Sequence, residues 1–343
     1  MANPLYDRMF GRYQGRDTTF LHLPGGGAIS HDSFLKRAAG IAHALCIQGA
    51  MPGDQVAAQI GKSTDALALY AACAQAGLIF LPLNIAYTPD EVSYFLDNSG
   101  ARVFVCDSPR ADKLQPVADA AGAVLMSLDG TGGGTLGTLA AEQPDSFDTV
   151  ARSEDDLAAF LYTSGTTGRS KGAMLSQRNL LSNSETLAEL WHFSETDVLL
   201  HALPIFHTHG LFVATNVTLA AGGSMIFLPK FDLDAMIAEL PRATAMMGVP
   251  TFYTRLLDDP RFTGDLVRHM RLFVSGSAPL LAETHVAFEK RTGHRILERY
   301  GMTETNMNTS NPYTGERRAG TVGFPLPDVE LKVTDPESGE LLE

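Results

Sequence analysis

The chain has 343 residues, a formal net charge of −13 and an apolar fraction of 45%. One small hydrophobic core rarely accommodates this length, so we expect a globular protein with two or three packed subdomains. The acidic balance argues against a general affinity for nucleic acid or for an anionic membrane surface. An anionic ligand would therefore need a local binding device.

The cysteines and the apolar runs indicate a cytoplasmic protein. Cys46, Cys73 and Cys106 are odd in number, lie in apolar segments and lack C-x-x-C spacing, which is typical of buried thiols in a reducing compartment. The N-terminal residues show neither a continuous apolar core nor a small-residue cleavage site, and no later run is long enough to span a bilayer. We therefore expect no membrane as a partner.

Residues 1–150 are predicted to form a first α/β half. An apolar segment at 55–60 precedes an amphipathic one at 63–77 and an apolar one at 78–84, and a second unit has a helix at 88–100, capped by Thr88, before a strand at 102–107. This alternation predicts a mostly parallel sheet covered by helices. Residues 128–150 contain few large apolar side chains and are expected to form a surface connection.

Residues 151–310 are predicted to form a second α/β half. Strands are expected at 157–162, 198–203, 224–229, 243–249, 270–275 and 295–300, with helices at 179–191, between the second and third of these strands, and at 280–293. Pro250 should end one strand and Gly293 the last helix. From residue 311 onward, segments punctuated by Pro and Gly predict the start of a small β subdomain.

Three polar loops follow predicted strands, at 163–172, 275–280 and 300–305. Ligands of parallel α/β sheets bind at such strand ends. The first loop holds three glycines, five hydroxyl side chains and Lys171, a combination that suits a polyphosphate because glycine lets the backbone approach and the other groups donate hydrogen bonds. The Walker pattern is absent. A mobile surface loop is the alternative, but it does not explain the apolar strand before it.

Five motifs occur in the order "YTSGTTGRSKG", "ALPIFHTHG", "SGSAPL", "ERYGMTE" and "GTVGFPLP". Together they resemble the motifs of the adenylate-forming acyl-CoA synthetase superfamily, over nearly the whole chain. The resemblance implies that residues 1–343 are the large N-terminal AMP-binding domain of such an enzyme. Its fold would be α/β, with two stacked, mostly parallel sheets built of βαβ units and a small barrel-like β subdomain.

The resemblance also implies a two-step reaction with ATP, Mg²⁺ and coenzyme A. A carboxylate attacks the α-phosphate of ATP to give an acyl-adenylate and diphosphate, and the thiol of coenzyme A then displaces AMP. The implied phosphate-binding residues are Thr163, Ser164, Gly165, Thr166, Thr167, Gly168 and Lys171. The implied nucleotide site continues with Ser277, Ala278, Pro279, Tyr300, Gly301 and Met302, with Tyr300 offering an aromatic face to adenine.

Thr303 and Glu304 are the implied catalytic pair of the "YGMTE" motif. Thr303 would hydrogen-bond the α-phosphate, and the Glu304 carboxylate would hold Mg²⁺. The alternative is a strand-to-turn junction in which the threonine caps the next helix and the glutamate is solvated. The phosphate loop and "SGSAPL" upstream favour the functional interpretation.

The segment "PIFHTHG" bears on the acid that is activated. Amino-acid-activating relatives carry an aspartate here, whereas this chain has Phe206 and His207, so an amino acid is not expected as substrate. His207 resembles the histidine of the family that lies beside the reacting carboxylate. A metal site formed by His201, His207 and His209 is the alternative, but no Cys, Asp or Glu nearby completes a ligand set.

The stretches "GVPTFYTRLL" and "SGSAPLL" resemble those of malonyl-CoA synthetases in particular. In that family an arginine and a serine at these places hold the distal carboxylate, which implies Arg255 and Ser277 as ligands of malonate or methylmalonate. A buried carboxylate needs such a partner, and guanidinium remains charged when desolvated. Two alternatives remain: a short- or medium-chain monocarboxylate ligase with Arg255 on the surface, and a non-catalytic nucleotide-binding module.

Two further features concern the limits of the resemblance. Gly132, Gly134 and Gly137 match G-x-G-x-x-G, but no long helix is expected before Pro144, so dinucleotide binding is disfavoured. Family members continue with a ribose-binding aspartate, a hinge and a C-terminal domain bearing a catalytic lysine, and this chain ends at Glu343. We therefore expect the C-terminal domain to be absent, and these residues alone to form little or no thioester.

Overall fold

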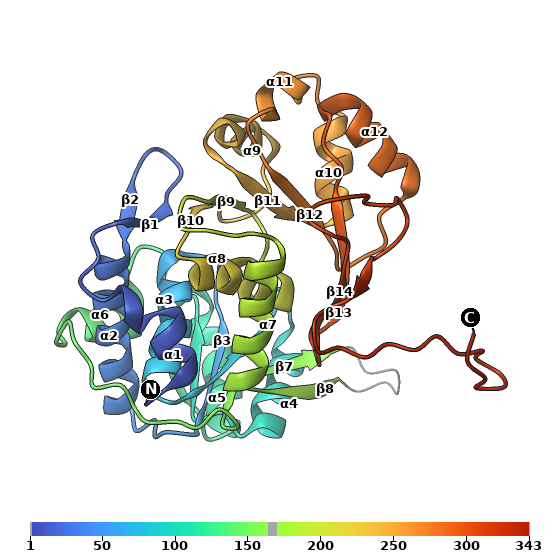
Figure 1. The fold of residues 1–343 in the computed structure, drawn as a ribbon. Helices are drawn as coiled ribbons and strands as arrows, with labels where there is room; N and C mark the ends of the chain where they lie inside the picture. The colour runs from blue at the N-terminus through green and yellow to red at the C-terminus, as the bar shows by residue number, and fades with distance from the viewer. Residues whose placement is uncertain (1, 164–169, 343) are drawn as a thin grey trace.

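Two β-sheets form the framework of this computed structural model, which describes residues 2–163 and 170–342 (Figure 1). The six-stranded sheet has the order β6 (Val124–Ser127), β5 (Val103–Cys106), β3 (Gln55–Gln59), β4 (Ile79–Pro82), β7 (Leu157–Thr163) and β8 (Lys171–Ser176). The nine-stranded sheet has the order β15 (Phe324–Pro325), β14 (Asn306–Ser310), β13 (Leu297–Met302), β12 (Leu272–Ser275), β11 (Ala245–Gly248), β9 (Val198–His201), β10 (Ser224–Phe227), β1 (Thr19–His22) and β2 (Ala28–Ser30).

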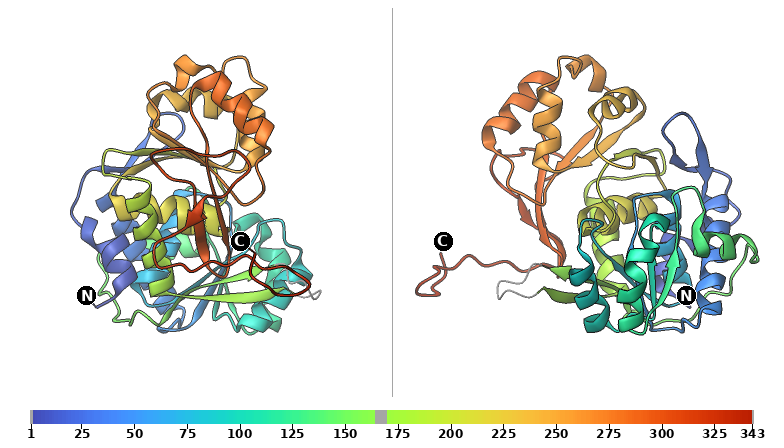
Figure 2. Two further views of the ribbon diagram at one scale, coloured as in Figure 1. Left: turned by 45° about the vertical axis from the view of Figure 1, so that its right-hand side comes forward. Right: turned by 180° about the vertical axis from the view of Figure 1, so that it is seen from behind.

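Most strand pairs are parallel, which confirms the predicted fold class. The antiparallel pairs are β7 with β8, β1 with β2, β13 with β14, and β14 with β15. Parallel strands need covering on both faces. The helices provide this cover in three layers, and the molecule therefore has five layers in all (Figure 2).

The helices divide among the layers according to the core that they share. The outer face of the six-stranded sheet carries α4 (Pro89–Ser99) and α5 (Ala111–Ala120), and that of the nine-stranded sheet carries α9 (Leu233–Glu239), α10 (Pro250–Leu257), α11 (Gly264–Val267) and α12 (Ala282–Thr292). The central layer holds α1 (Pro4–Met9), α2 (His31–Ile47), α3 (Thr64–Gln75), α7 (Gln177–Leu190), the π-helical segment η3 (His209–Thr215) and α8 (Asn216–Ala221). The largest core cluster joins both sheets through this layer, since it includes Val56, Leu67, Leu199 and Val217.

Two predicted helix signals are confirmed. The Thr88 hydroxyl accepts a hydrogen bond from the Glu91 backbone while the Glu91 carboxylate accepts one from the Thr88 backbone, so two otherwise orphaned N–H groups at the start of α4 are satisfied. Gly293 follows α12 with φ of 78°. This left-handed conformation is costly for residues with a Cβ atom, so glycine ends the helix there.

The predicted boundary near residue 150 does not coincide with the division between the sheets. β1 and β2 lie in the nine-stranded sheet, whereas β7 and β8 lie in the six-stranded sheet. Each half of the chain therefore contributes strands to both sheets. Residues 128–150 also differ from the expected surface connection, because α6 (Gly134–Ala141) packs on α2 with Leu136 and Ala140 buried.

Strand β8 was not predicted, because residues 163–172 are expected to form a loop and residues 173–178 are assigned to no element. It pairs with β7 as an antiparallel edge strand, with Thr163 opposite Lys171. Gly172 faces Phe160 so closely that a Cβ atom would lie 2.0 Å from its ring. Likewise, β13 extends to Met302, so residues 300–302 belong to a strand and not to a loop.

Three other expectations concern the surface. Cys73 and Cys106 are buried thiols as expected, but Cys46 is exposed. No helix in the described part of the chain is long and apolar enough to cross a membrane.

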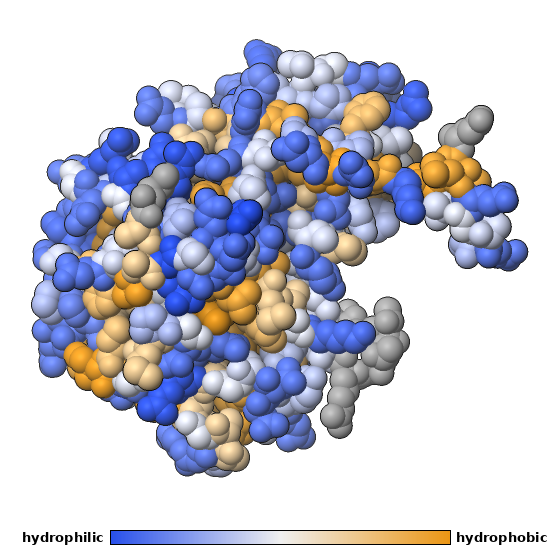
Figure 3. Space-filling view, turned by 60° about the horizontal axis from the view of Figure 1, so that its bottom comes forward, coloured by the Kyte–Doolittle hydropathy of each residue, from blue (hydrophilic) through white to orange (hydrophobic). Residues whose placement is uncertain are grey.

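Beyond Asn311, the described residues form β15 and one bridge between Thr334 and Leu341. They lie in a segment that projects from the body and carries exposed apolar side chains (Figures 1 and 3).

Candidate active site

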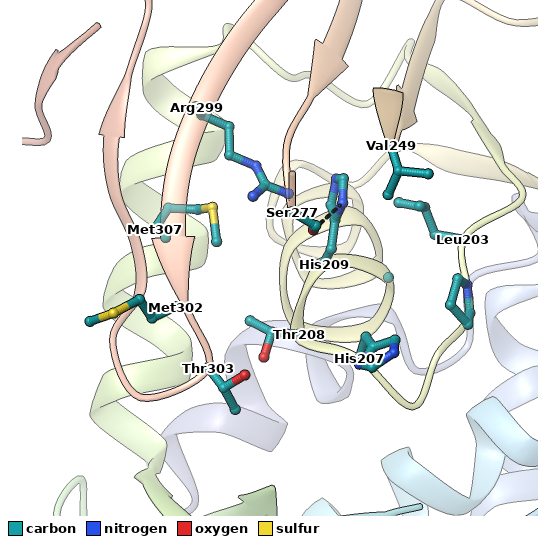
Figure 4. A pocket seen from close by; sticks show the side chains of 13 residues that line it. Leu203, His207, Thr208, His209, Val249, Ser277, Arg299, Met302, Thr303 and Met307 are labelled. Carbon is teal, nitrogen blue, oxygen red and sulfur yellow. Dashed lines mark hydrogen bonds between the residues drawn. The ribbon is translucent and has the colours of Figure 1, made fainter. Parts of the chain in front are cut away.

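A cavity of about 410 Å³ lies where the carboxyl ends of β9, β11 and β12 meet. We call it the histidine cavity. Its lining comes from the loop after β9 and the start of η3 (Leu203, Pro204, His207, Thr208, His209, Gly210), from the start of α10 (Val249), from the turn after β12 (Ser277) and from the β13–β14 hairpin (Arg299, Gly301, Met302, Thr303, Met307). The fold thus brings together four segments that are separated in the sequence (Figure 4).

His209 and Ser277 are in direct contact across this cavity. The Ser277 hydroxyl lies 3.1 Å from Nδ1 of His209, and the other ring nitrogen of His209 is buried without a hydrogen-bond partner in the described structure. Burial, and then the positive charge of Arg299, hold the pKa of His209 well below its usual value. His209 is therefore neutral at physiological pH.

Arg299 is the most unusual group of the histidine cavity. Only 3% of its surface is exposed, and its Nε and Nη2 atoms have no hydrogen-bond partner among the described residues. No carboxylate of that part of the chain forms an ion pair with it. Burial lowers the pKa of Arg299 to about 10, so the guanidinium remains charged at neutral pH. Its side chain extends from β13 toward Ser277 and His209 (Figure 4).

An unpaired buried cation is costly, and native proteins almost always compensate it. Arg299 lines the same cavity as Ser277, with its Nε and Nη2 atoms buried. A planar guanidinium donates two parallel hydrogen bonds to a carboxylate. An organic anion in the histidine cavity would compensate this charge.

Gly276 allows Arg299 to take this position. A Cβ atom at residue 276 would lie 2.4 Å from the guanidinium carbon of Arg299, closer than side chains approach one another. We expect Gly276→Ala to displace Arg299 and to weaken binding of the anion about tenfold or more, with nucleotide affinity much less affected. Calorimetric titrations of anion and nucleotide check this, and equal losses for both ligands would contradict it.

A second cavity, of about 340 Å³, lies on the other side of β13 and the Ser277 turn. We call it the tyrosine cavity. The structure brings Tyr300 together here with Ser277, Ala278 and Pro279, as expected from the sequence, and adds Glu298 and Val322. Tyr300 is 44% exposed. A free aromatic face opposite an apolar turn suits a flat heteroaromatic ring.

Thr303 and Glu304 lie in the turn between β13 and β14. Thr303 lines the histidine cavity, whereas Glu304 is exposed beside a separate hollow that Asn183 and Asp328 also line. The alternative in which Thr303 caps a helix is wrong, because β14 follows the turn. Gly301 and Met302 belong to β13 and line the histidine cavity, and Gly301 lines the tyrosine cavity as well.

The segment predicted to bind phosphates is described only at its ends. Ser164, Gly165, Thr166, Thr167 and Gly168 lie outside the described residues. At the two ends, the Thr163 hydroxyl donates to the Lys171 carbonyl at 3.4 Å, and Lys171 is exposed.

Aromatic residues anchor both ends of this segment. The Tyr94 hydroxyl donates to the Ser170 carbonyl at 2.9 Å, and the Tyr162 hydroxyl donates to Asn98 at 2.7 Å. Both ends are therefore tied to α4.

Arg255 is not where the sequence led us to expect it. It lies exposed on α10 with its guanidinium 4.4 Å from the centre of the Phe231 ring, and it lines neither the histidine cavity nor the tyrosine cavity. Arg299, and not Arg255, lies with Ser277 in the lining of the histidine cavity. The burial of Arg299 could not be predicted from the sequence, because arginine is far more often exposed than buried.

His207 lies at the mouth of the histidine cavity. Its ring packs on Phe206 with 4.5 Å between the ring centres, and it also borders a small hollow together with Thr303. The surrounding walls desolvate the imidazolium form and lower the pKa of His207. His207 is therefore a neutral hydrogen-bonding group near the entrance.

No group of three or more His, Cys, Asp or Glu side chains that could hold a metal ion occurs within residues 2–163 and 170–342. His201 instead contacts Lys62 and Gly210. The glycines of the G-x-G-x-x-G match serve local packing, since a Cβ atom at Gly137 would lie 2.1 Å from the Gly132 carbonyl oxygen.

The two cavities lie at strand ends, where parallel α/β sheets commonly bind their ligands. The chain belongs to the AMP-binding enzyme family, whose model matches residues 11–343. This membership agrees with the fold class expected from the motifs.

Curated relatives and solved structures resemble the chain over most of its length. It is 34% identical over 287 residues to a malonate–CoA ligase of Arabidopsis thaliana, which covers 76% of this chain and 47% of that protein. It is 36% identical to the mitochondrial malonate–CoA ligase of Mus musculus, with 77% of this chain and 48% of that protein covered. The chain thus spans about half the length of these relatives.

The ATP-bound crystal structure of MatB from Rhodopseudomonas palustris superposes with a TM-score of 0.96 at 53% identity. This match covers 100% of the present chain and 68% of that chain. The fold described here is therefore that of the larger part of MatB.

Proposed function

We propose that these residues form the nucleotide- and acid-binding domain of an AMP-forming malonate–CoA ligase. The single observation that carries the choice of acid is Arg299, a buried guanidinium that has unsatisfied donors and lines a cavity together with Ser277. A dicarboxylate has one carboxylate to pair with this cation and a second one to react. The malonate–CoA ligases among the relatives support this assignment.

In the proposed complex, Arg299 and Ser277 hold the distal carboxylate of malonate or methylmalonate. The other carboxylate then faces the entrance, near His207 and Thr303, which both line the histidine cavity. A carboxylate oxygen attacks the α-phosphorus of ATP, the bond from that phosphorus to the bridging oxygen breaks, and diphosphate leaves. Displacement of AMP by the thiol of coenzyme A would complete the reaction.

The proposed nucleotide site places adenine against Tyr300 in the tyrosine cavity and the triphosphate along the turn at Thr303 toward the segment 163–171. Charge neutralisation and positioning are what phosphoryl chemistry requires of a protein. Lys171 and the hydroxyl groups of the segment would supply the donors for the β- and γ-phosphates. The Thr303 hydroxyl would donate to the α-phosphate.

Glu304 fits the role of a magnesium ligand in part. It is an exposed carboxylate at the turn, and Mg²⁺ commonly takes one or two carboxylates together with phosphate oxygens and water. Bound Mg²⁺ would neutralise charge on the phosphates. The cytoplasmic location stays a prediction, and the relative from Mus musculus is described as mitochondrial.

Tyr300 provides a test of the nucleotide site. We expect Tyr300→Ala to weaken ATP binding about tenfold, because stacking of a base on an aromatic side chain contributes about 1–3 kcal/mol. Tyr300→Phe keeps the ring and should change the affinity by less than about twofold. Titration of both variants with Mg²⁺ and a non-hydrolysable ATP analogue checks this, and an equal loss in both would argue against stacking.

The proposal as a whole is tested by the acid dependence of diphosphate exchange into ATP. Malonate or methylmalonate should support exchange, and acetate or butyrate should not. Exchange with the monocarboxylates alone would favour the short- or medium-chain ligase. Nucleotide binding without exchange, even when a C-terminal domain from a relative is supplied, would favour a non-catalytic module.

A further inference from the structure

We propose that Lys62 is a positioning residue of the histidine cavity. It keeps His201 in the tautomer that donates a hydrogen bond to the Gly210 carbonyl, and this bond joins the two ends of the loop of residues 201–210. Lys62 lies between β3 and α3, next to the six-stranded sheet, and His201 is the last residue of β9 in the other sheet. The importance of this contact for acid binding rests on the proposed function. The contact itself does not.

The Lys62 amino group contacts a histidine and an aromatic ring of the nine-stranded sheet. Nζ lies 2.8 Å from Nδ1 of His201 and 2.8 Å from the His201 carbonyl oxygen. It also lies 4.2 Å from the centre of the Phe227 ring, and burial lowers the pKa of Lys62 well below its usual value, although the amino group donates hydrogen bonds in either protonation state. No carboxylate in the described part of the chain forms an ion pair with Lys62. A histidine from the opposite sheet thus replaces the acidic partner that a partly buried lysine normally has.

The second ring nitrogen decides the tautomer of His201. Nε2 lies 2.8 Å from the Gly210 carbonyl oxygen, which only accepts hydrogen bonds, so Nε2 must carry the hydrogen. Nδ1 then carries no hydrogen and can only accept a hydrogen bond, which the Lys62 amino group donates. Thr215 also donates to the Gly210 carbonyl, at 3.0 Å. Burial keeps the pKa of His201 well below its usual value, so the ring is neutral.

The bond from His201 to Gly210 closes a loop that builds much of the histidine cavity. Leu203, Pro204, His207, Thr208 and His209 all line the cavity and all lie between its two ends. Gly210 is the second residue of the π-helical segment η3 and packs so closely on the Pro204 carbonyl oxygen that a Cβ atom would lie 2.0 Å away. π-Helical turns are rare, and the hydrogen bond from His201 attaches the start of this one to the end of β9.

Removal of the Lys62 amino group should therefore act on the cavity through His201. Without a donor at Nδ1, the hydrogen moves to Nδ1 in part of the population. In those molecules the Nε2 lone pair faces the Gly210 oxygen, and the repulsion loosens the end of the loop that carries His209. Since His209 contacts Ser277, we expect malonate affinity to fall more than nucleotide affinity.

The experiment compares the chain of 343 residues with its Lys62→Met and Lys62→Arg variants. Lys36→Met is the matched control, because Lys36 is an exposed lysine paired with Asp32. Selective ¹⁵N labelling of histidine, with a His201→Gln spectrum for assignment, reports which ring nitrogen of His201 carries the hydrogen. We expect Nε2–H in the unaltered chain, a mixture of tautomers in Lys62→Met, and Nε2–H again in Lys62→Arg and Lys36→Met.

Calorimetric titration supplies the second measurement. Lys62→Met should weaken malonate binding about tenfold and nucleotide binding less than about twofold. In a His201→Gln background, the glutamine side-chain amide donates to the Gly210 carbonyl with or without the Lys62 amino group. Adding Lys62→Met to this variant should therefore change malonate affinity very little. An Nδ1–H tautomer in the unaltered chain, or ring signals unchanged by Lys62→Met, would overturn the inference. If the tautomer responds but the unaltered chain binds no malonate, the positioning role stands and the proposed acid is wrong.

Discussion

Arg299→Met is expected to weaken malonate binding about 100-fold and, in the same chain, to raise its stability without ligand. The variant removes the cation that pairs with the distal carboxylate, and loss of one partner of a buried charge pair costs about 2–5 kcal/mol of binding free energy. It also removes a guanidinium that is buried without an anion. Replacing a buried charge by an apolar side chain of similar size is often stabilising, by about 1–4 kcal/mol.

Calorimetry with malonate and acetate, together with urea unfolding of the unliganded chain, measures both effects. Arg255→Met is the control, because the Arg255 guanidinium stacks on Phe231 outside both cavities. It should change malonate affinity by less than about twofold. If Arg255→Met abolishes malonate binding and Arg299→Met does not, Arg255 is the residue that binds the distal carboxylate, as the resemblance to malonyl-CoA synthetases implied.

This opposition of binding and stability is typical of a preformed ligand site. A charge that is unsatisfied before binding lowers the stability of the free protein, and the anion then gains the full interaction when it enters. Ser277 shows a related feature, since its φ of 69° places a non-glycine residue in the left-handed region. Such conformations persist at functional sites where the surrounding structure holds them.

Local patterns predicted local structure well. Alternation of apolar segments identified β3, β4 and β5 and the helices between them, and the Thr88 and Gly293 signals located helix ends. These features depend on neighbours within a few residues. The order of strands in the sheets depends on pairing between distant segments, which is why the membership of β1, β2, β7 and β8 could not be inferred.

The candidate site shows the same limit. The motifs drew attention to Tyr300, Thr303 and Ser277, and the structure brings them to two adjacent cavities. Arg299 immediately precedes Tyr300 in the sequence, yet its burial is set by Gly276 on another strand end. Arg255 had the same residue type and a plausible position in the chain. Only packing distinguishes the buried guanidinium from the exposed one.

Asp197→Asn is expected to reduce the free energy of unfolding by about 3 kcal/mol or more near neutral pH, because it leaves a partly buried arginine without its anion. Asp197 is 3% exposed and accepts two hydrogen bonds from Arg271, at 2.6 and 2.7 Å. It also accepts hydrogen bonds from the Thr244 hydroxyl and the Ser194 backbone. These contacts tie together the starts of β9, β11 and β12. Asp155→Asn, at an exposed ion pair with Arg178, is the control and should cost less than about 1 kcal/mol.

The loss of unfolding free energy caused by Asp197→Asn should become smaller as the pH falls. Burial alone would raise the pKa of Asp197, but hydrogen bonds from Arg271, Thr244 and Ser194 outweigh it and lower the pKa. The unfolded chain therefore binds this proton at a higher pH than the folded chain does. The stabilisation is complete above the unfolded pKa of about 4 and is lost as pH falls through the lower folded value. Urea unfolding of both proteins should show a constant difference from about pH 8 to 5.5 that narrows below about pH 4. A difference that widens in acid would mean that Asp197 is not the ionised partner of Arg271.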